Sequence, residues 1–187
     1  MPPKVKINKH EIIKTAVELV RENGEQSINA RAIALNLNCS TQPIFSNFSC
    51  MEQLKLEVKA VAYQTYLDFI ASEISGGRYP HYKAMGMAYI KFALREKQLF
   101  KLLFMCDRQG EKLTPTKDFE EAVQLIMQAN GVSYEKASLI HFETWACVHG
   151  IATMLATSFL SLEENFISDV LTDTYQGIRA KHLSEEG

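Results

Sequence analysis

The sequence has little of what membrane-spanning and secreted proteins require. Its longest apolar stretch, residues 151–160, is interrupted by threonine and serine, whereas a membrane-spanning helix needs about 20 consecutive apolar residues. The first residues, MPPKVKINK, contain no apolar core of a signal peptide. We therefore expect no membrane span and a cytoplasmic location.

Paired cysteines and the usual catalytic motifs are also missing. The four cysteines (Cys39, Cys50, Cys106 and Cys147) form no CxxC pair, so we expect packing residues in a reducing compartment rather than a disulfide or zinc framework. The sequence has no glycine-rich phosphate loop, no HExxH, no GxSxG and no convincing pair of carboxylates. These absences predict a protein that is not an enzyme and has neither a metal nor a cofactor.

A strong excess of one charge is absent, because the formal net charge is -2. The charge is nevertheless unevenly distributed. Residues 1–60 carry eight lysines and arginines against six acidic residues, a balance of +2, and the remainder carries a balance of -4. A weakly basic N-terminal part followed by an acidic remainder is typical of a DNA-binding protein with a separate regulatory domain.

Helical patterns account for nearly all of the sequence, of which 47% is hydrophobic. Glycine and proline fall mostly between periodic segments, and no alternating strand pattern persists. We therefore predict an all-α fold of about nine helices. Their expected ranges are 8–23, 29–37, 40–48, 49–74, 80–95, 97–106, 117–129, 133–159 and 161–181.

Polar residues mark the ends of several predicted helices. Asn8 with Glu11, and Ser49 with Glu52, have the spacing of a capping box. The segment Asn23-Gly24 is a typical helix end. The helix that begins near Ser49 is long enough to belong to both an N-terminal and a C-terminal domain.

The stretch from Asn29 to Phe48, NARAIALNLNCSTQPIFSNF, predicts a helix-turn-helix. Ile33, Ala34 and Leu37 share one face of the first helix, and Ile44 with Phe48 forms the facing stripe of the second. Asn38 occupies the turn position that favours a positive φ, which asparagine tolerates well. The small side chain of Ala34 permits a close crossing of the two helices.

The second helix of this motif is predicted to point polar side chains outward. Ser40 fits its N-cap, and Pro43 fits its first turn, where the missing N–H has no intrahelical partner. A short outward face rich in hydrogen-bonding groups suits the edges of bases in the major groove of DNA. The residues available to it are Thr41, Gln42, Phe45, Ser46 and Asn47.

Together with its surroundings, this segment resembles the DNA-binding domain of TetR-family transcriptional repressors. The family pattern is a helix ending in glycine, then T-x-x-x-I-A-x-x-x-G-V-S-x-x-x-L-Y-x-x-F, then K-x-x-L. The residues that fall in register, between Lys9 and Leu54, are Glu22-Asn23-Gly24, Ile33-Ala34, Ser40, Ile44-Phe45, Phe48 and Leu54. The sequence departs from the pattern at Asn38 (usually Gly), Phe45 (usually Tyr), Met51 (usually Lys) and Lys97 (commonly Pro).

The resemblance implies a set of DNA contacts. Arg31 matches a position that often contacts a guanine or a phosphate, and Lys55 could replace a phosphate contact that Met51 lacks. Gln42 can bridge two atoms of adenine, and threonine can offer a methyl and a hydroxyl group. A basic arm of Lys4, Lys6 and Lys9 could follow the backbone. The expected DNA-binding residues are Arg31, Thr41, Gln42, Phe45, Ser46, Asn47 and Lys55.

A second resemblance lies in the C-terminal part. The segment Trp145-Ala-Cys-Val-His149-Gly150 resembles the W-x-x-x-H-G motif of one subgroup of TetR regulatory domains. His141, Trp145 and His149 recur every four residues, hence on one stripe of one helix. Three interpretations stay open: a structural core with Gly150 at a close helix contact, the lining of an effector pocket, or a metal site that adds Cys147 or Cys106.

Aromatic and methionine side chains on the surrounding helices could form the walls of an effector pocket. Few charged residues fall on these faces, so we expect a small, lipophilic effector that is neutral or aromatic. The candidate lining residues are Tyr63, Tyr66, Met85, Tyr89, Phe104, Trp145 and His149. Apolar stripes on the last two helices predict a homodimer, or else burial within one monomer, with candidate interface residues Leu155, Phe159, Phe166, Val170 and Ile178.

The resemblance implies a helix-turn-helix DNA-binding domain at 1–48 and a helical domain at 49–187 for effector binding and dimerisation. The expected function is that of a repressor that binds a palindromic operator in double-stranded DNA as a homodimer and is released by a small molecule. Two alternatives remain open. One is a small helical enzyme that uses His149 with Cys106 or Cys147. The other is a ligand-binding protein that no longer binds DNA, as Met51 and Phe45 would allow.

Overall fold

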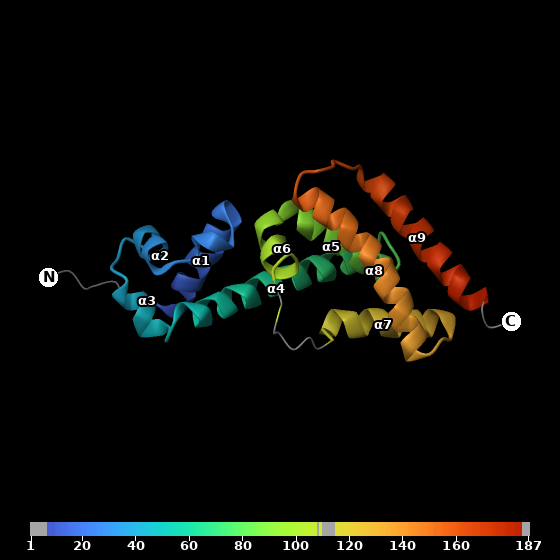
Figure 1. The fold of residues 1–187 in the computed structure, drawn as a ribbon, viewed down its shortest axis with the longest axis horizontal. Helices are drawn as coiled ribbons and strands as arrows, with labels where there is room; N and C mark the ends of the chain where they lie inside the picture. Colours follow the sequence, from blue (N-terminus) through green and yellow to red (C-terminus); the bar gives the residue numbers. More distant parts are fainter. Residues whose placement is uncertain (1–6, 108, 110–114, 185–187) are drawn as a thin grey trace. The chain divides into compact units, whose positions relative to one another are not determined.

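Helices form all the regular structure of the described residues, which are 7–107, 109 and 115–184 of a computed structural model (Figure 1). The predicted all-α fold is confirmed. The elements are α1 (Lys9–Asn23), a 3-10 turn η1 (Glu25–Ser27), α2 (Ala30–Asn36), α3 (Gln42–Asn47), α4 (Met51–Ser75), α5 (His81–Arg95), α6 (Lys97–Phe104), α7 (Lys117–Asn130), α8 (Tyr134–Ala156) and α9 (Glu164–Ser184).

The chain packs as two compact units. Unit 1 comprises residues 1–65 and 96–106, and unit 2 comprises residues 66–95 and 107–187. The boundary falls inside α4, which continues unbroken from one unit into the other. This division by packing differs from the predicted functional division at residue 48, which stays a prediction.

The predicted ends of α1 are confirmed. The Glu11 backbone N–H donates to Asn8 Oδ1 at 3.0 Å, and the Asn8 backbone N–H donates to Glu11 Oε2 at 2.8 Å, which completes a capping box. The helix stops where Gly24 adopts φ +81°, a value that a residue with a Cβ rarely takes. The long helix α4 begins differently from the prediction, because the Ser49 hydroxyl donates to Gln53 Oε1 at 3.0 Å where Glu52 was expected.

The helix-turn-helix of unit 1 forms as predicted, except for its second cap. Asn38 takes φ +50° in the turn, and the Asn29 side chain caps α2 by accepting from the Ala32 N–H. The prediction that Ser40 caps α3 is wrong. The N-cap is Thr41, which makes no side-chain cap bond because its backbone is already helical, and Pro43 lies in the first turn as expected.

The core of unit 1 joins α1 to the helix-turn-helix. Fully or almost fully buried side chains come from α1, α2, α3 and the start of α4: Ile12, Ala16, Val20, Ile33, Ala34, Ile44, Phe48 and Leu54. Helix α6 packs against α1 in the same unit. There the Arg21 guanidinium donates to both carboxylate oxygens of Glu96, at 3.0 and 3.2 Å, so one ion pair fastens the two helices.

Unit 2 is built around α8, which packs against α5, α7 and α9. One apolar cluster in this unit joins α7 and α8 and consists of Val123, Ile126, Val132, Ala137 and Ile140. Helices α5, α8 and α9 approach closely at Gly86, where an added Cβ would lie 3.2 Å from Leu171 Cδ2. Helix α8 ends earlier than the predicted residue 159, because Ser158 turns the chain at φ +58°.

Among the described residues, no helix is both long enough and apolar enough to cross a membrane.

Candidate DNA-binding surface and ligand site

Helix α3 exposes a short polar face. Gln42 and Ser46 are exposed, and 54% of Phe45 is exposed, whereas Ile44 is fully buried. Thr41 and Asn47 lie half-buried at the edges of this face. An amide, a hydroxyl and a phenyl ring are thus presented together, as groups that can contact base edges and a thymine methyl.

Two of these side chains also bond to their own helix. The Ser46 hydroxyl donates to the Gln42 carbonyl at 2.9 Å, and Asn47 Nδ2 donates to the Pro43 carbonyl at 2.7 Å. Ser46 therefore faces outward as an acceptor, and Asn47 keeps one N–H to donate. The Gln42 side chain presents a donor and an acceptor side by side with no bond to its own helix, and Asn47 keeps Oδ1 as an acceptor beside its remaining N–H.

The cations of unit 1 fall into two groups. Lys9 pairs with Glu57, and Arg21 pairs with Glu18 and Glu96. In the part of the chain that the structure describes, Arg31 and Lys55 form no ion pair, and Arg31 is exposed on α2. Arg31 and Lys55 are therefore among the cations of unit 1 that are available to phosphate. Lys4 and Lys6 of the predicted arm lie outside the described residues.

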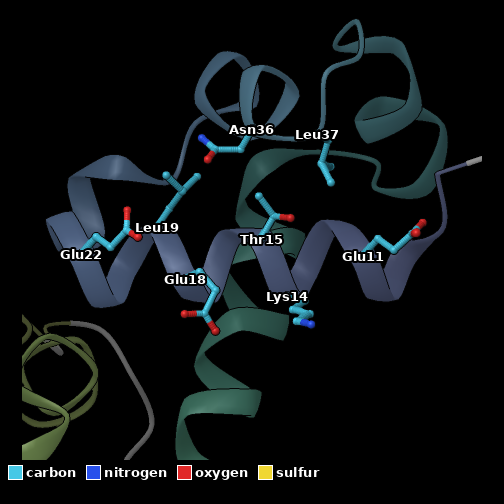
Figure 2. Close-up of a pocket in the computed structure, with 8 residues that line it drawn as sticks. All are labelled: Glu11, Lys14, Thr15, Glu18, Leu19, Glu22, Asn36 and Leu37. Carbon is cyan, nitrogen blue, oxygen red and sulfur yellow. The ribbon is translucent and has the colours of Figure 1, made fainter.

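The face of α1 has the opposite character. A shallow hollow of about 320 Å³ lies between α1 and the end of α2, and Figure 2 shows Thr15 and Leu19 pointing toward Asn36 and Leu37. The other lining residues are Glu11, Lys14, Glu18 and Glu22. Three carboxylates against one lysine would repel a phosphate backbone, so this face is unsuited to DNA.

Four of the predicted effector residues come together in unit 2. The Tyr89 hydroxyl lies 2.8 Å from His149 Nδ1, and the Trp145 and His149 rings stack at 4.9 Å between centroids. The rings of Tyr66 and Tyr89 meet edge to face at 5.7 Å. We call Tyr66, Tyr89, Trp145 and His149 the aromatic cluster. Met85, also predicted, is buried in α5 of the same unit.

The other two predicted lining residues, Tyr63 and Phe104, belong to unit 1. Phe104 packs there against Phe100, with 5.4 Å between ring centroids.

Sequence reasoning missed Asp118, which lies beside the aromatic cluster. The Tyr66 hydroxyl donates to Asp118 Oδ2 at 3.1 Å. Phe119, the next residue of α7, packs against His141 at 5.1 Å between ring centroids. In the sequence Asp118 looks like an ordinary acidic residue in the first turn of a helix, and only the packing of α7 reveals its neighbours.

Burial keeps the histidines of this region neutral near pH 7. It lowers the pKa of both His141 and His149, although the Asp118 carboxylate raises the pKa of His141 in part. Burial, with Asp118 as a second cause, raises the pKa of Tyr89. The Tyr89 hydroxyl therefore stays protonated, and its oxygen lies 2.8 Å from His149 Nδ1 in a hydrogen bond whose direction depends on the imidazole tautomer.

Comparison with known proteins agrees with this architecture. Residues 82–174, which run from α5 into α9, match the family model described as a tetracyclin repressor-like C-terminal domain. The chain belongs to the TetR family. It is a DNA-binding regulator of transcription whose C-terminal domain is of the ligand-responsive type. A search of curated proteins finds no match to the sequence. The W-x-x-x-H-G subgroup stays a prediction.

The three interpretations of the Trp145 stripe in this TetR-family chain can now be compared. Trp145 is 37% exposed, and His149 contacts the hydroxyl groups of Tyr89 and Thr153. A Cβ at Gly150 would meet no atom within 4 Å, so the close helix contact expected there is wrong. The stripe is therefore only partly buried, and the effector-pocket interpretation stays a prediction.

The metal interpretation finds little support. Among the described residues, no three histidine, cysteine or acidic side chains gather closely enough to hold a metal ion. Cys147 Sγ lies 3.5 Å from Thr174 Oγ1, on the side of α8 that faces α9. Cys106 belongs to unit 1.

The predicted dimer residues differ in exposure. Phe159 is 75% exposed and Phe166 is 57% exposed, whereas Val170 and Ile178 are half-buried on α9. Leu155 is 2% exposed and belongs to the core of unit 2. The first four side chains are available to a partner, and their assignment to an interface stays a prediction.

Proposed function

We propose that this TetR-family protein is a homodimeric repressor that binds a palindromic operator and is released by a small-molecule effector. The observation that carries the proposal is the exposed face of α3, where Gln42, Phe45 and Ser46 point outward from a fully buried Ile44. A face of this composition suits base reading better than a catalytic task, because it offers amide, hydroxyl and aryl groups without a base that could activate the hydroxyl.

The small size of this face supports the homodimer. Helix α3 has six residues, so one copy can read only a few base pairs. A second copy related by a two-fold axis would supply a second half-site in inverted orientation. Phe159 and Phe166, together with the half-buried apolar residues of α9, offer the surface for that association.

The continuous helix α4 supports release by an effector. Tyr66 of α4 belongs to the aromatic cluster, while Leu54 of the same helix is buried in the core of unit 1. An effector that displaces Tyr66 would shift α4 and so change the distance between the two α3 helices of the dimer, which contact the DNA. Such coupling needs only about 1–3 kcal/mol.

A double variant in the helix-turn-helix tests the proposed DNA contacts directly. Gln42→Ala with Arg31→Ala should abolish specific operator binding, measured by fluorescence anisotropy, while the dimer measured by sedimentation stays intact. The matched control is Gln128→Ala with Arg95→Ala, which removes the same exposed side-chain types from unit 2 and should bind normally. Unchanged binding by the first variant would contradict the assignment of α3.

A further inference from the structure

Helices α8 and α9 lie side by side in unit 2 with opposite chain directions (Figure 1). Two contacts between them fix their alignment. His182 Nε2 of α9 lies 3.0 Å from the Glu143 carboxylate of α8, and Thr174 Oγ1 lies 3.5 Å from Cys147 Sγ. The parts of α8 and α9 between these two contacts are therefore at the same level.

Helix α8 turns an uncharged stripe away from α5. The stripe recurs every four residues and consists of Phe142, Ala146 and Gly150. Val148 approaches α5, and Ala146 and Gly150 are each two residues from it, hence on nearly the opposite side of the helix. Phe142 is 60% exposed, and residues 144–162 contain no lysine, arginine, aspartate or glutamate. A solvated helix face normally carries charges, so this stripe is suited to contact with another protein surface.

Helix α9 turns a charged stripe to the same side. Lys83 of α5 donates to Ser168 at 2.7 Å, and Gly177 lies about two and a half turns further along α9, hence on the side away from α5. Asp173 and Lys181, both exposed, stand four residues before and four residues after Gly177. Glycine weakens a helix interior, and an added Cβ at Gly177 would meet no atom within 4 Å. The fold of the described residues therefore gives no steric reason for glycine at this position.

A two-fold axis through the middle of the α9 stripe matches its two charges. In a contact between identical copies, residue i of one copy meets residue j of the other, and j meets i in turn. Two α9 helices that cross antiparallel at Gly177 would bring Asp173 of each copy to Lys181 of the other. Ala146 lies at the level of Gly177, between the two contacts that join the helices. The same axis therefore crosses α8 at Ala146.

This axis also matches the α8 stripe, by size. Two α8 helices that cross antiparallel at Ala146 would place Phe142 of each copy over Gly150 of the other. An added Cβ at Gly150 meets no atom within 4 Å, so the ring would cover open space. Alanine at this position would leave room for the ring, whereas leucine would occupy its place. One axis thus gives opposite charges on α9 and a large side chain against a small one on α8.

We propose that two copies of this chain associate through the sides of α8 and α9 that face away from α5, each helix antiparallel to its own copy, on a two-fold axis at Ala146 and Gly177. Glycine at the axis permits a close approach of the two α9 backbones. Two pairs of Asp173 with Lys181 set the register, and two pairs of Phe142 with Gly150 provide the apolar centre. This inference rests on the proposed function and specifies the interface of its homodimer.

Exchanging the two charges tests the register. Asp173→Lys would place lysines together across the axis, and Lys181→Asp would place aspartates together, so each should weaken the dimer at least about tenfold at low salt. The double variant restores opposite charges and should dimerise within about threefold of the unmodified chain. Asp169→Lys is the matched control, because it makes the same change at an exposed position of the same helix outside the stripe; it should leave the dimer unchanged.

Gly150→Leu tests the contact of α8. The monomer has space for a Cβ there, so the fold should be kept, while the leucine should weaken the dimer at least about tenfold by excluding the ring of Phe142. Phe142→Ala removes the exposed ring itself and makes the same test if Gly150→Leu folds poorly, as far-ultraviolet circular dichroism would reveal.

All dimer affinities are measured without DNA, by sedimentation equilibrium with fluorescence detection. A dimer that these variants do not weaken, or that the double charge exchange does not restore, would overturn this interface and leave the homodimeric repressor standing. An unmodified chain that stays monomeric would contradict the homodimer of the proposed function and this interface with it.

Discussion

The reading face of unit 1 and the aromatic cluster of unit 2 use their polar groups in opposite ways. On α3, Ser46 and Asn47 bond to carbonyls four residues earlier in the same helix. In unit 2, Tyr66 reaches Asp118 and Tyr89 reaches His149, across 52 and 60 residues of sequence. The first surface is organised locally and the second by tertiary packing.

This difference has a functional consequence. A face whose polar groups bond within their own helix depends little on side chains of other helices, which suits a rigid reader of DNA. A cluster held by bonds between helices changes whenever those helices move, which suits a sensor. Substitutions in the two regions should therefore change the properties of the protein in different ways.

The largest expected effect is a loss of stability of unit 1 when a buried side chain beneath α3 is truncated. Ile44→Ala should destabilise unit 1 by about 2–5 kcal/mol, because it leaves a cavity under α3 where the side chain is fully buried. Leu35→Ala removes a side chain that is 77% exposed and should change stability little. Urea unfolding followed by circular dichroism measures both. Similar losses in the two variants would contradict the packing described for α3.

In unit 2 two glycines give a similar comparison between a crowded and an open position. Gly86→Val should destabilise by about 1–3 kcal/mol, because a Cβ there already lies 3.2 Å from Leu171 Cδ2 and 3.6 Å from Val148 Cγ2.

Gly150→Ala is its counterpart on α8. It should stabilise by about 0.5–1 kcal/mol, because alanine favours the helix and its Cβ meets no atom. Thermal unfolding of both variants gives the test, and the expectation fails if the two changes have the same sign.

A smaller effect is expected for the ion pair between α1 and α6. The side chains of Arg21 and Glu96 are 33% and 21% exposed, so solvent screens part of their attraction. We expect a coupling of about 0.5–1 kcal/mol in a double-mutant cycle of Arg21→Ala and Glu96→Ala. The coupling should shrink as salt rises, and a coupling of zero at low salt would show that the pair does not fasten α6.

The smallest effect concerns pH. Burial lowers the pKa of His141 in the folded protein, so below the unfolded value of about 6.5 the unfolded chain binds more protons. Stability should therefore fall as pH drops below about 6.5, and His141→Gln should reduce that slope. Denaturant unfolding at several pH values measures it. An identical slope in both proteins would mean that other groups carry the pH dependence.

The sequence predicted the parts of the fold that depend on local chemistry. The capping box of Asn8, the positive φ of Asn38 and the exposed face of α3 follow from residue type and spacing alone. The cap of α3 was missed because Thr41 adopts helical backbone angles, which displaces Ser40 from the expected position. Propensity describes which residue can cap, but the turn geometry decides which one does.

The ligand site was only partly predictable, for a physical reason. Tyr66, Tyr89, Trp145 and His149 lie on stripes of regular helical spacing, so a shared face could be expected. Asp118 follows no such pattern, and its role depends on how α7 packs beside α4 and α8. The exposure of Trp145 and the open space at Gly150 likewise depend on packing.

The most direct test of the account is a selection of genomic DNA fragments with the purified protein at moderate salt, followed by a footprint of the best fragment. We predict a protected inverted repeat whose affinity falls steeply as salt rises, because phosphate contacts by both copies release counterions. The Gln42→Ala, Arg31→Ala variant should leave that repeat unprotected. No enrichment over random DNA, even at low salt, would contradict the account and leave unit 2 as a ligand-binding domain without a DNA target.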